Sequence, residues 1–349
     1  MKNKFVSFVR RDLGVPLVGI TLPSDYSQSE VTGLSDLMAS FSIITSVPEA
    51  LKKISHPREL LAGARSIIMV AVPNYIERAL DFEQCREKLL GTASALHVTA
   101  ELLARLKEIT GSINSFFTSR GFACRELSGT LFPAKIIASR CGIGFYGKNS
   151  MILHPDHGSW LSLIGFITDA ILEPDEKLEG DCGTCTLCVT ACPVKALHTP
   201  YHCDEMRCVN FHLGHNKRKI PLEVRAACRN IIGQSCTVCK DVCPKNKHLR
   251  PLPDYHPPKE LLNPPLLDIL HMDESEWKKT FGRTLLGLTM RDKKYLKRNA
   301  AIALGNFKDE RAVPALEHLL RSGDDEVEEY AAWALEKICS PEVFNRVRD

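Results

Sequence analysis

Residues 182–193 read Cys182-Gly183-Thr184-Cys185-Thr186-Leu187-Cys188-Val189-Thr190-Ala191-Cys192-Pro193. The cysteines are separated by two, two and three residues, and a proline follows the fourth. Thiolates at this spacing hold three corners of a 4Fe–4S cluster from one turn of backbone, while the fourth thiolate reaches a second cluster. Zinc is the alternative, because C-x₂-C pairs also form zinc sites, but zinc does not account for the complete run. The stretch therefore predicts an iron–sulfur redox domain.

A second cysteine run is incomplete. It contains Cys236, Cys239 and Cys243, followed directly by Pro244, but the position that would complete the pattern is Gly233. The two runs supply seven thiolates, whereas two Cys₄ clusters need eight. Three cysteines lie between the runs and are the candidates for the missing ligand: Cys203, Cys208 and Cys228.

The crossed ligation of bacterial ferredoxins predicts how the thiolates divide between the clusters. The first cluster takes four of them: Cys182, Cys185, Cys188 and Cys243. The second takes Cys192, Cys236, Cys239 and one of the three candidates.

The composition is that of an ordinary globular protein. Its 349 residues are 44% hydrophobic and 25% charged, which leaves room for two or three domains. The net charge of +3 permits contact with nucleic acid without arguing for it. The N-terminus lacks the apolar core of a signal peptide, and the most apolar stretches are too short to span a membrane. We therefore expect a cytoplasmic protein without a membrane partner.

The pattern of the chain changes at three places. Residues 1–175 alternate helices and strands, with a clear strand at 66–72 ended by Pro73-Asn74, one long helix or two within 93–117, and a helix at 133–141. Residues 176–250 hold the cysteine runs. Residues 251–290 are predicted to form a proline-rich linker and a helix. The segment begins with six prolines within fifteen residues, which predicts a stiff linker without regular helix or sheet in that proline-rich part.

Residues 291–349 carry apolar residues at helical spacing from about residue 294 onward. The pattern resembles HEAT repeats, in which two helices form each unit of about 40 residues. Asp324 or Asp325 is the expected cap of the third helix in this segment. The fold class predicted for the whole chain is α+β, with an N-terminal α/β domain, a ferredoxin-like domain and HEAT-like helices.

A literal G-x-G-x-x-G occurs at Gly142-Ile143-Gly144-Phe145-Tyr146-Gly147. A dinucleotide fingerprint needs a strand before the glycines and a helix after them. Here a helical pattern precedes the motif and a strand pattern follows it, so the motif does not indicate a nucleotide site. We expect the glycines either to let the backbone approach something flat and bulky or to form a turn.

Several segments together resemble the cobalamin-dependent epoxyqueuosine reductases of tRNA modification. The matching segments, in addition to the cysteine runs, are residues 60–67, 140–144, 147–150 and 158–159, Arg298-Asn299-Ala300 and Leu304-Gly305-Asn306. The stretch from Arg207 to Leu213 matches the one that holds the first cysteine of the family's second set. The resemblance therefore selects Cys208 as the eighth ligand.

The resemblance implies a corrinoid in residues 1–175, in a fold similar to that of nitroreductase-like cobalamin-processing enzymes and reductive dehalogenases. The two clusters would pass electrons singly to cobalt, and a low-potential donor of the flavodoxin or ferredoxin type would supply them. The residues expected to border the corrinoid are Arg140, Gly142, Gly144, Tyr146, Gly147, Lys148, Asn149 and Ser150.

The sequence departs from the family at the residue that donates a proton to the substrate. The family has an Asp fourteen residues before the first glycine of its Gly-Leu-Gly motif, and the corresponding position here is Ser128. The family's Glu-Arg pair falls on Ala134 and Lys135, so only the positive charge is kept. Glu126 is the nearest acid. We therefore expect Glu126, Ser128 and Lys135 to be the catalytic candidates.

Three hypotheses about function follow from this resemblance. The first is a corrinoid and double-cluster reductase whose substrate differs from the queuosine precursor. The second is the epoxyqueuosine enzyme itself. In that case the basic residues of segment 291–298 could bind the phosphates of tRNA. The alternative interpretation of this segment is a solvated helix face. The third is an electron-delivery protein that reactivates the corrinoid of a partner protein.

Overall fold

The computed structural model describes residues 1–27, 55–76, 80–127, 133–215, 217–253, 255–342 and 344. It contains two compact units, each assembled from three segments of the chain. The first unit comprises residues 1–75, 105–206 and 238–252, and the second comprises 76–104, 207–237 and 253–349. These units cut across the continuous domains expected from the sequence, because the cysteine-rich segment contributes to both.

The first unit is built on a four-stranded sheet with the strand order β1-β2-β6-β3. Its strands are β1 (Leu17–Thr21), β2 (Ser66–Pro73), β6 (Leu161–Thr168) and β3 (Cys124–Leu127). Every neighbouring pair is antiparallel, and Val70 of β2 lies opposite both Val18 and Ile164. An antiparallel sheet with helices outside it confirms the α+β class.

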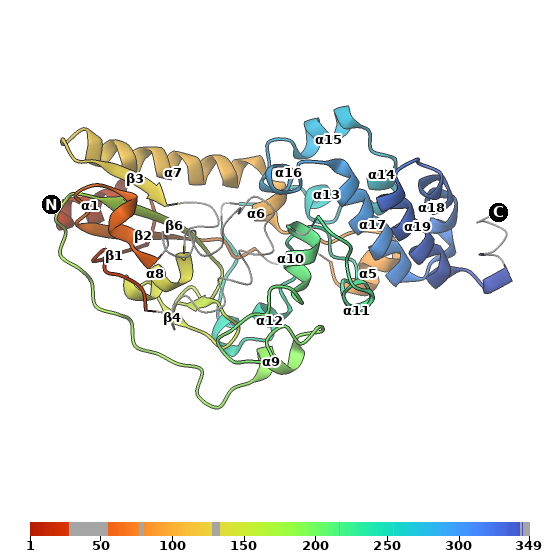
Figure 1. The fold of residues 1–349 in the computed structure, drawn as a ribbon, viewed down its shortest axis with the longest axis horizontal. Coiled ribbons are helices and arrows are strands. Elements are labelled where there is room, and N and C mark those ends of the chain that lie inside the picture. The colour runs from red at the N-terminus through yellow and green to blue at the C-terminus, as the bar shows by residue number, and fades with distance from the viewer. Residues whose placement is uncertain are drawn as a thin grey trace. The chain divides into compact units, whose positions relative to one another are not determined.

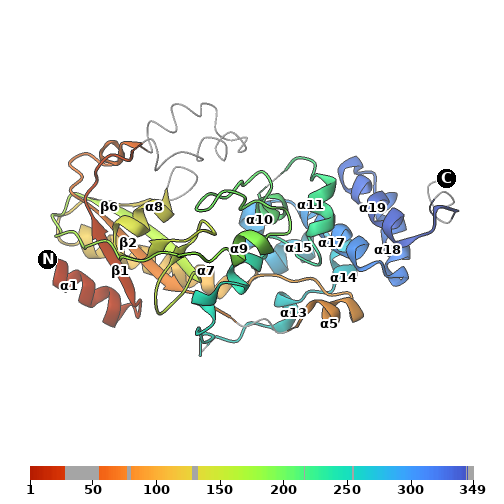
Figure 2. The ribbon, with the colours of Figure 1, turned by 90° about the horizontal axis from the view of Figure 1, so that it is seen from below.

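Helices cover both faces of this sheet (Figures 1 and 2). One face packs against α1 (Lys2–Ser7), the following π-helical turn at Phe8–Asp12, and α7 (Ala100–Thr118), through an apolar core that includes Phe5 and Phe166. The other face packs against α8 (Ala134–Arg140), through a core that includes Met69 and Ile137. Side chains alternate between the faces along each strand, so neighbouring residues belong to different cores.

The remaining elements of the first unit are short. They are the 3-10 turn Pro57–Leu60, the hairpin of β4 (Phe145–Tyr146) and β5 (Ile152–Leu153), α9 (Leu187–Ala191), α12 (Val238–Asp241) and the 3-10 turn Pro244–Asn246. α9 and α12 carry residues of the two cysteine runs and pack against each other (Figure 1).

The second unit is helical in its described residues. Its helices are α5 (Phe82–Glu87), α6 (Ala95–Val98), α10 (Val209–Gly214), α11 (Leu222–Ala227), α13 (Lys259–Leu262), α14 (Leu266–His271), α15 (Glu274–Phe281), α16 (Leu285–Met290), α17 (Lys293–Phe307), α18 (Val313–Leu320) and α19 (Asp325–Ile338), with a 3-10 turn at Glu310–Ala312. α17 and α18 both pack against α19. Gly305 allows the close approach of α17 to α19, because a Cβ there would lie 2.8 Å from Trp333.

Two details of the helical part bear on the sequence predictions. Asp324 is the N-cap of α19, as expected, and its carboxylate accepts the backbone N–H of Glu326. The expectation of no helix among the prolines is wrong, because α13 follows Pro258 and α14 follows Pro265. Proline is tolerated at the start of a helix, where its missing N–H would have no partner within the helix. No described helix is both long enough and apolar enough to span a bilayer.

α17 also holds the ends of α10 and α11. The buried Arg298 side chain donates to the carbonyl of His212 at 3.0 Å, and Asn299 donates to the carbonyl of Leu213 at 2.8 Å. Asn306 donates to the carbonyl of Arg225 at 2.9 Å. The last carbonyls of a helix have no partner within it, so Arg298 and Asn299 supply the donors that α10 lacks. The Asn306 amide adds a second donor to the Arg225 carbonyl, which also accepts the N–H of Cys228 at 3.3 Å.

Replacement of Asn299 by alanine (Asn299→Ala) should lower the free energy of unfolding. The change removes the donor to the Leu213 carbonyl, and a buried acceptor left unsatisfied costs about 1–3 kcal/mol. Urea unfolding of the anaerobically purified protein measures the loss. Glu336→Ala, on an exposed position of α19, is the control. Equal losses in the two variants would contradict the capping role.

Candidate functional site

The four cysteines predicted for the first cluster come together within the first unit. Cys182 and Cys185 precede α9, Cys188 lies in α9, and Cys243 directly precedes the 3-10 turn at Pro244–Asn246. Burial raises the pKa of Cys188, and the proximity of Cys182, Cys243 and Cys185 raises that pKa further, against a hydrogen bond from the backbone of Val189. Four thiols gathered in one place are suited to a metal centre, because a bound metal replaces their protons.

Apolar side chains surround part of this thiol group. Phe145 of β4 and Leu153 of β5 pack against Cys243, and the partly buried Leu178 and Cys182 pack against this apolar group. An apolar wall limits the access of water to a bound cluster and thereby affects its reduction potential. The hairpin that follows α8 therefore borders the predicted cluster site.

Lys148 and Asn149, in the loop between β4 and β5, contact both cysteine runs. The backbone N–H of Lys148 points to the Cys182 sulfur at 3.4 Å, and its ammonium group donates to the carbonyls of Gly183 at 2.6 Å and Cys185 at 3.1 Å. The side chain of Asn149 donates to the carbonyl of Cys239 at 3.5 Å. All these residues belong to the first unit.

Asn246 joins the second cysteine run to the turn before β6. Its amide group donates to the Ser159 hydroxyl at 3.0 Å and to the Lys240 carbonyl at 2.8 Å, and its oxygen accepts the Ser159 N–H at 2.9 Å. Gly158 has a φ of +53° and lies so close to Asn246 that a Cβ would overlap the amide oxygen. The contacts with Asn246 therefore explain why a glycine and a serine stand at positions 158 and 159.

The ligands predicted for the second cluster are divided between the units. In the first unit, the Cys192 sulfur accepts the N–H of Ala196 at 3.2 Å. In the second unit, Cys208 is the N-cap of α10, and Asn210 makes two hydrogen bonds to Cys236. The amide of Asn210 donates to the Cys236 carbonyl at 3.0 Å, and its oxygen accepts the Cys236 N–H at 2.7 Å. The start of α10 is thus fixed beside Cys236.

Cys228, another candidate for the eighth ligand, is in a different environment. Its side chain is fully buried, and its thiol donates to the carbonyl of Val224 at 3.1 Å. Burial is the largest cause of the strongly raised pKa of Cys228, followed by the proximity of Cys236. These properties are those of a protonated structural thiol. Cys203, the remaining candidate, is half-buried.

The glycines of the loop after α8 contact the protein itself. Gly142 has a φ of +71°, and a Cβ there would lie 2.3 Å from the carbonyl oxygen of Glu176. A Cβ on Gly144 or Gly147 would come within 2.6 Å of Leu153. The sequence offered two roles for these glycines, a close approach to a flat and bulky group or a tight turn. The tight turn accounts for their contacts.

Three polar side chains form a chain of hydrogen bonds next to this loop. Lys135 of α8 donates to the Ser150 hydroxyl at 3.4 Å, and the hydroxyl groups of Ser150 and Tyr146 are 3.2 Å apart. Ser150 is buried and has a φ of +60°, which is uncommon for a residue other than glycine. Such backbone strain is found most often at functional sites.

Glu126 lies on the other face of the sheet from this chain. It is opposite Phe166 in the β3–β6 pair, and directly opposed residues of antiparallel strands point to the same face. Phe166 belongs to the core under α1 and α7, whereas Lys135 belongs to α8 on the opposite face. The geometry therefore argues against Glu126 as a partner of Lys135. Ser128 lies outside the described residues.

Arg140, at the end of α8, anchors the segment after β1. Its guanidinium donates to the carbonyls of Ser24 and Asp25 at 3.0 and 3.1 Å, and it stacks on Tyr26 at 4.3 Å. These contacts give Arg140 a structural role next to the predicted corrinoid site.

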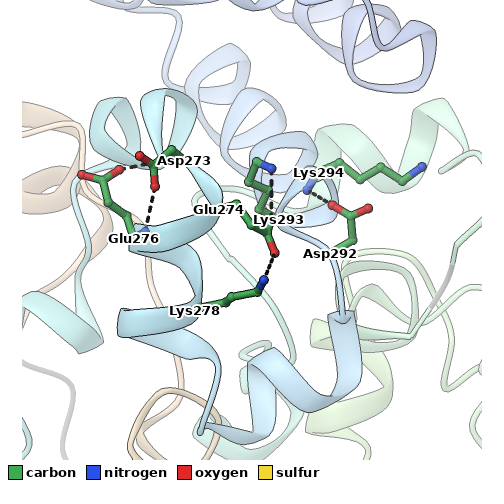
Figure 3. A network of polar contacts seen from close by, with 7 residues as sticks. All are labelled: Asp273, Glu274, Glu276, Lys278, Asp292, Lys293 and Lys294. Atoms are coloured by element: carbon green, nitrogen blue, oxygen red, sulfur yellow. Dashed lines mark hydrogen bonds and ion pairs between the residues drawn. The ribbon is translucent and has the colours of Figure 1, made fainter.

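The basic residues of segment 291–298 are largely paired with acids or buried. Lys293 pairs with Glu274 at 3.1 Å, in the network shown in Figure 3 that also includes Lys278. Lys294 pairs with Glu326 at 3.0 Å, and Arg298 is 1% exposed. A solvated, ion-paired helix face describes the segment better than a surface for tRNA phosphates.

Two family models match the chain. One, described as a 4Fe-4S double cluster binding domain, covers residues 181–246, and the other, described as HEAT repeats, covers residues 284–349. They confirm the ferredoxin-like and HEAT-like segments.

Named relatives match nearly the whole chain. The epoxyqueuosine reductase of Bacillus subtilis (strain 168) is 31% identical over 98% of this chain and 88% of its own length. The epoxyqueuosine reductase of Escherichia coli (strain K12) is 30% identical over 93% of this chain and 86% of its own length.

Solved structures agree with these relatives. A crystal structure of selenomethionine-labelled epoxyqueuosine reductase, 29% identical, matches with a TM-score of 0.87 over 99% of this chain and 93% of that chain. An epoxyqueuosine reductase solved with an epoxyqueuosine-modified tRNA-Tyr stem loop, 30% identical, matches with a TM-score of 0.85 over 98% of this chain and 91% of that chain.

Proposed function

Because the chain belongs to the epoxyqueuosine reductase family, we propose that it reduces epoxyqueuosine in tRNA, with electrons passed from two 4Fe–4S clusters to a corrinoid. The observation that carries this proposal is the convergence of Cys182, Cys185, Cys188 and Cys243 beside the loop after α8. The relative solved with a modified tRNA stem loop supports tRNA as the substrate class. This choice favours the second of the three functional hypotheses.

The polar groups around this loop are suited to a corrinoid, whose rim carries amide groups. Tyr146 and Ser150 offer hydroxyls, and Lys135 offers an ammonium group. When bound, the corrinoid supplies a strongly reducing cobalt centre.

In this proposal, the proton for the reaction comes from the chain formed by Lys135, Ser150 and Tyr146. A lysine ammonium group carries protons, and hydroxyls can pass protons between hydrogen-bonded groups. The two distances of 3.4 and 3.2 Å are long, and catalytic hydrogen bonds often shorten only when the substrate is bound.

The proposal is tested by expressing the chain in a strain that lacks its epoxyqueuosine reductase and measuring queuosine in its tRNA. Queuosine should reappear, and a Cys188→Ser variant should fail to restore it. Anaerobically purified protein, analysed for iron and for binding of added cobalamin, provides the second measurement. Absence of queuosine despite bound clusters and cobalamin would assign a different substrate. Bound iron without any binding of cobalamin would favour electron delivery to a partner protein.

A further inference from the structure

Lys148 directs its hydrogen bonds toward the first cysteine run. Its ammonium group contacts two carbonyls in the turn that spaces Cys182 from Cys185, and its backbone N–H points to the Cys182 sulfur. The turn is also closed by the N–H of Cys185, which donates to the carbonyl of Cys182 at 3.1 Å. The lysine therefore fixes the shape of the loop that presents two predicted cluster ligands.

We infer that Lys148 sets the reduction potential of the first cluster and positions its binding turn. Reduction adds one electron to a cluster that is already surrounded by four thiolates. A nearby positive charge and an N–H···S hydrogen bond both stabilise the added negative charge, so both raise the potential. Lys148 supplies both from one residue. The inference rests on the double-cluster part of the proposed function and needs neither the corrinoid nor the substrate.

The backbone around Lys148 is held in place, which makes this effect specific. The carbonyl of Lys148 accepts the N–H of Tyr201 at 3.2 Å, and Gly147 donates to the carbonyl of Met151 at 2.8 Å. Asn149, the next residue, is 3% exposed and contacts the carbonyl of Cys239. Consecutive residues of one loop thus contact the first and the second cysteine run, and Lys148 is the charged residue of this pair.

The test is a redox titration of the anaerobically reconstituted full-length protein, with dithionite as reductant and electron paramagnetic resonance as the readout. Lys148→Gln should shift the midpoint potential of one of the two clusters to a more negative value and leave the other unchanged. Lys148→Arg keeps the charge and should retain the wild-type potential. An unchanged potential in Lys148→Gln would overturn the inference.

Lys245→Gln is the matched control. Lys245 lies close to Cys243 and over the Phe145 ring at 5.1 Å, so its removal also deletes one positive charge at this site. The Lys148 ammonium group donates to two carbonyls of the first cysteine run, whereas no hydrogen bond from the Lys245 ammonium group is found among the described residues. The expected shift of Lys245→Gln is therefore smaller than that of Lys148→Gln, and an equal shift would overturn the specific role of Lys148. If Lys148→Gln assembles too little iron to titrate, Lys148→Arg is the deciding variant. Full iron content and the wild-type potential in Lys148→Arg would support the inference, and a partial iron content in Lys148→Arg would overturn it.

The titration uses no substrate, so it separates this inference from the proposed function. A negative shift in Lys148→Gln, combined with failure to restore queuosine, would retain the role of Lys148 and remove the assignment of tRNA. Restored queuosine together with an unshifted potential in Lys148→Gln would retain the assignment of tRNA and remove the role of Lys148.

Discussion

Replacement of Cys208 by serine should cost the protein about four of its irons, because it removes one of the four thiolates that a 4Fe–4S cluster requires. Reductase activity should be lost with them, since electrons would no longer pass through both clusters. The structural reason is local to the second unit. Cys208 is the N-cap of α10, and two hydrogen bonds between Asn210 and Cys236 hold that helix start in place. Iron analysis and the absorption spectrum after anaerobic reconstitution measure the loss.

The other two candidates for the eighth ligand provide matched controls. Cys228→Ser should retain the full iron content, because the Cys228 thiol is buried and donates to the Val224 carbonyl, which a serine hydroxyl can also contact. Cys203→Ser should retain it as well. Loss of iron in either control, with full iron in Cys208→Ser, would transfer the ligand assignment to that residue.

Replacement of Lys135 by glutamine (Lys135→Gln) should lower kcat for epoxyqueuosine reduction by about 10²–10⁴-fold, the usual contribution of a positioned acid or base. The change removes the charge and the proton source at one end of the chain that continues through Ser150 to Tyr146. Tyr146→Phe, which removes the hydroxyl at the other end, should lower kcat in the same direction. Single-turnover assays with pre-reduced protein measure the chemical step.

Glu126→Gln tests the alternative source of the proton. Glu126 is exposed on the face of the sheet opposite α8, so its neutralisation should leave kcat unchanged. Iron content and cobalamin binding are measured in all three variants, because a loss of either would lower activity without any change in proton transfer. A large loss of kcat in Glu126→Gln, with an unaffected Lys135→Gln, would restore Glu126 as the acid.

The spacing of the cysteines was sufficient to predict which thiols lie close together in the first unit, whereas their role as cluster ligands stays a prediction. Cys182, Cys185 and Cys188 lie within one turn of chain, and the following proline marks the pattern, so their mutual approach is a local property. Cys243 is distant in sequence, and the crossed pattern of ferredoxins identified it. The strand at 66–73 and the helices after residue 293 were likewise predictable from their apolar periodicity.

The side chains that support the cysteines were not predictable in the same way. Asn246 and Asn210 each follow a predicted ligand by two or three residues, and a polar amide beside such a cysteine is the only signal in the sequence. Their partners, Ser159 and Cys236, become neighbours only through the tertiary fold. The direction of Glu126 depended on the register of β3 with β6, which a four-residue strand does not reveal.

The caps that α17 provides to α10 have a thermodynamic consequence. Arg298 and Asn299 bind the last carbonyls of the helix whose first residue follows Cys208. With Cys208 as a ligand, iron that binds only the folded protein stabilises α10, and through these caps it stabilises α17. Iron is then a folding ligand for the C-terminal helices as well as an electron carrier. We therefore expect loss of the second cluster to lower the free energy of unfolding of α10 and α17.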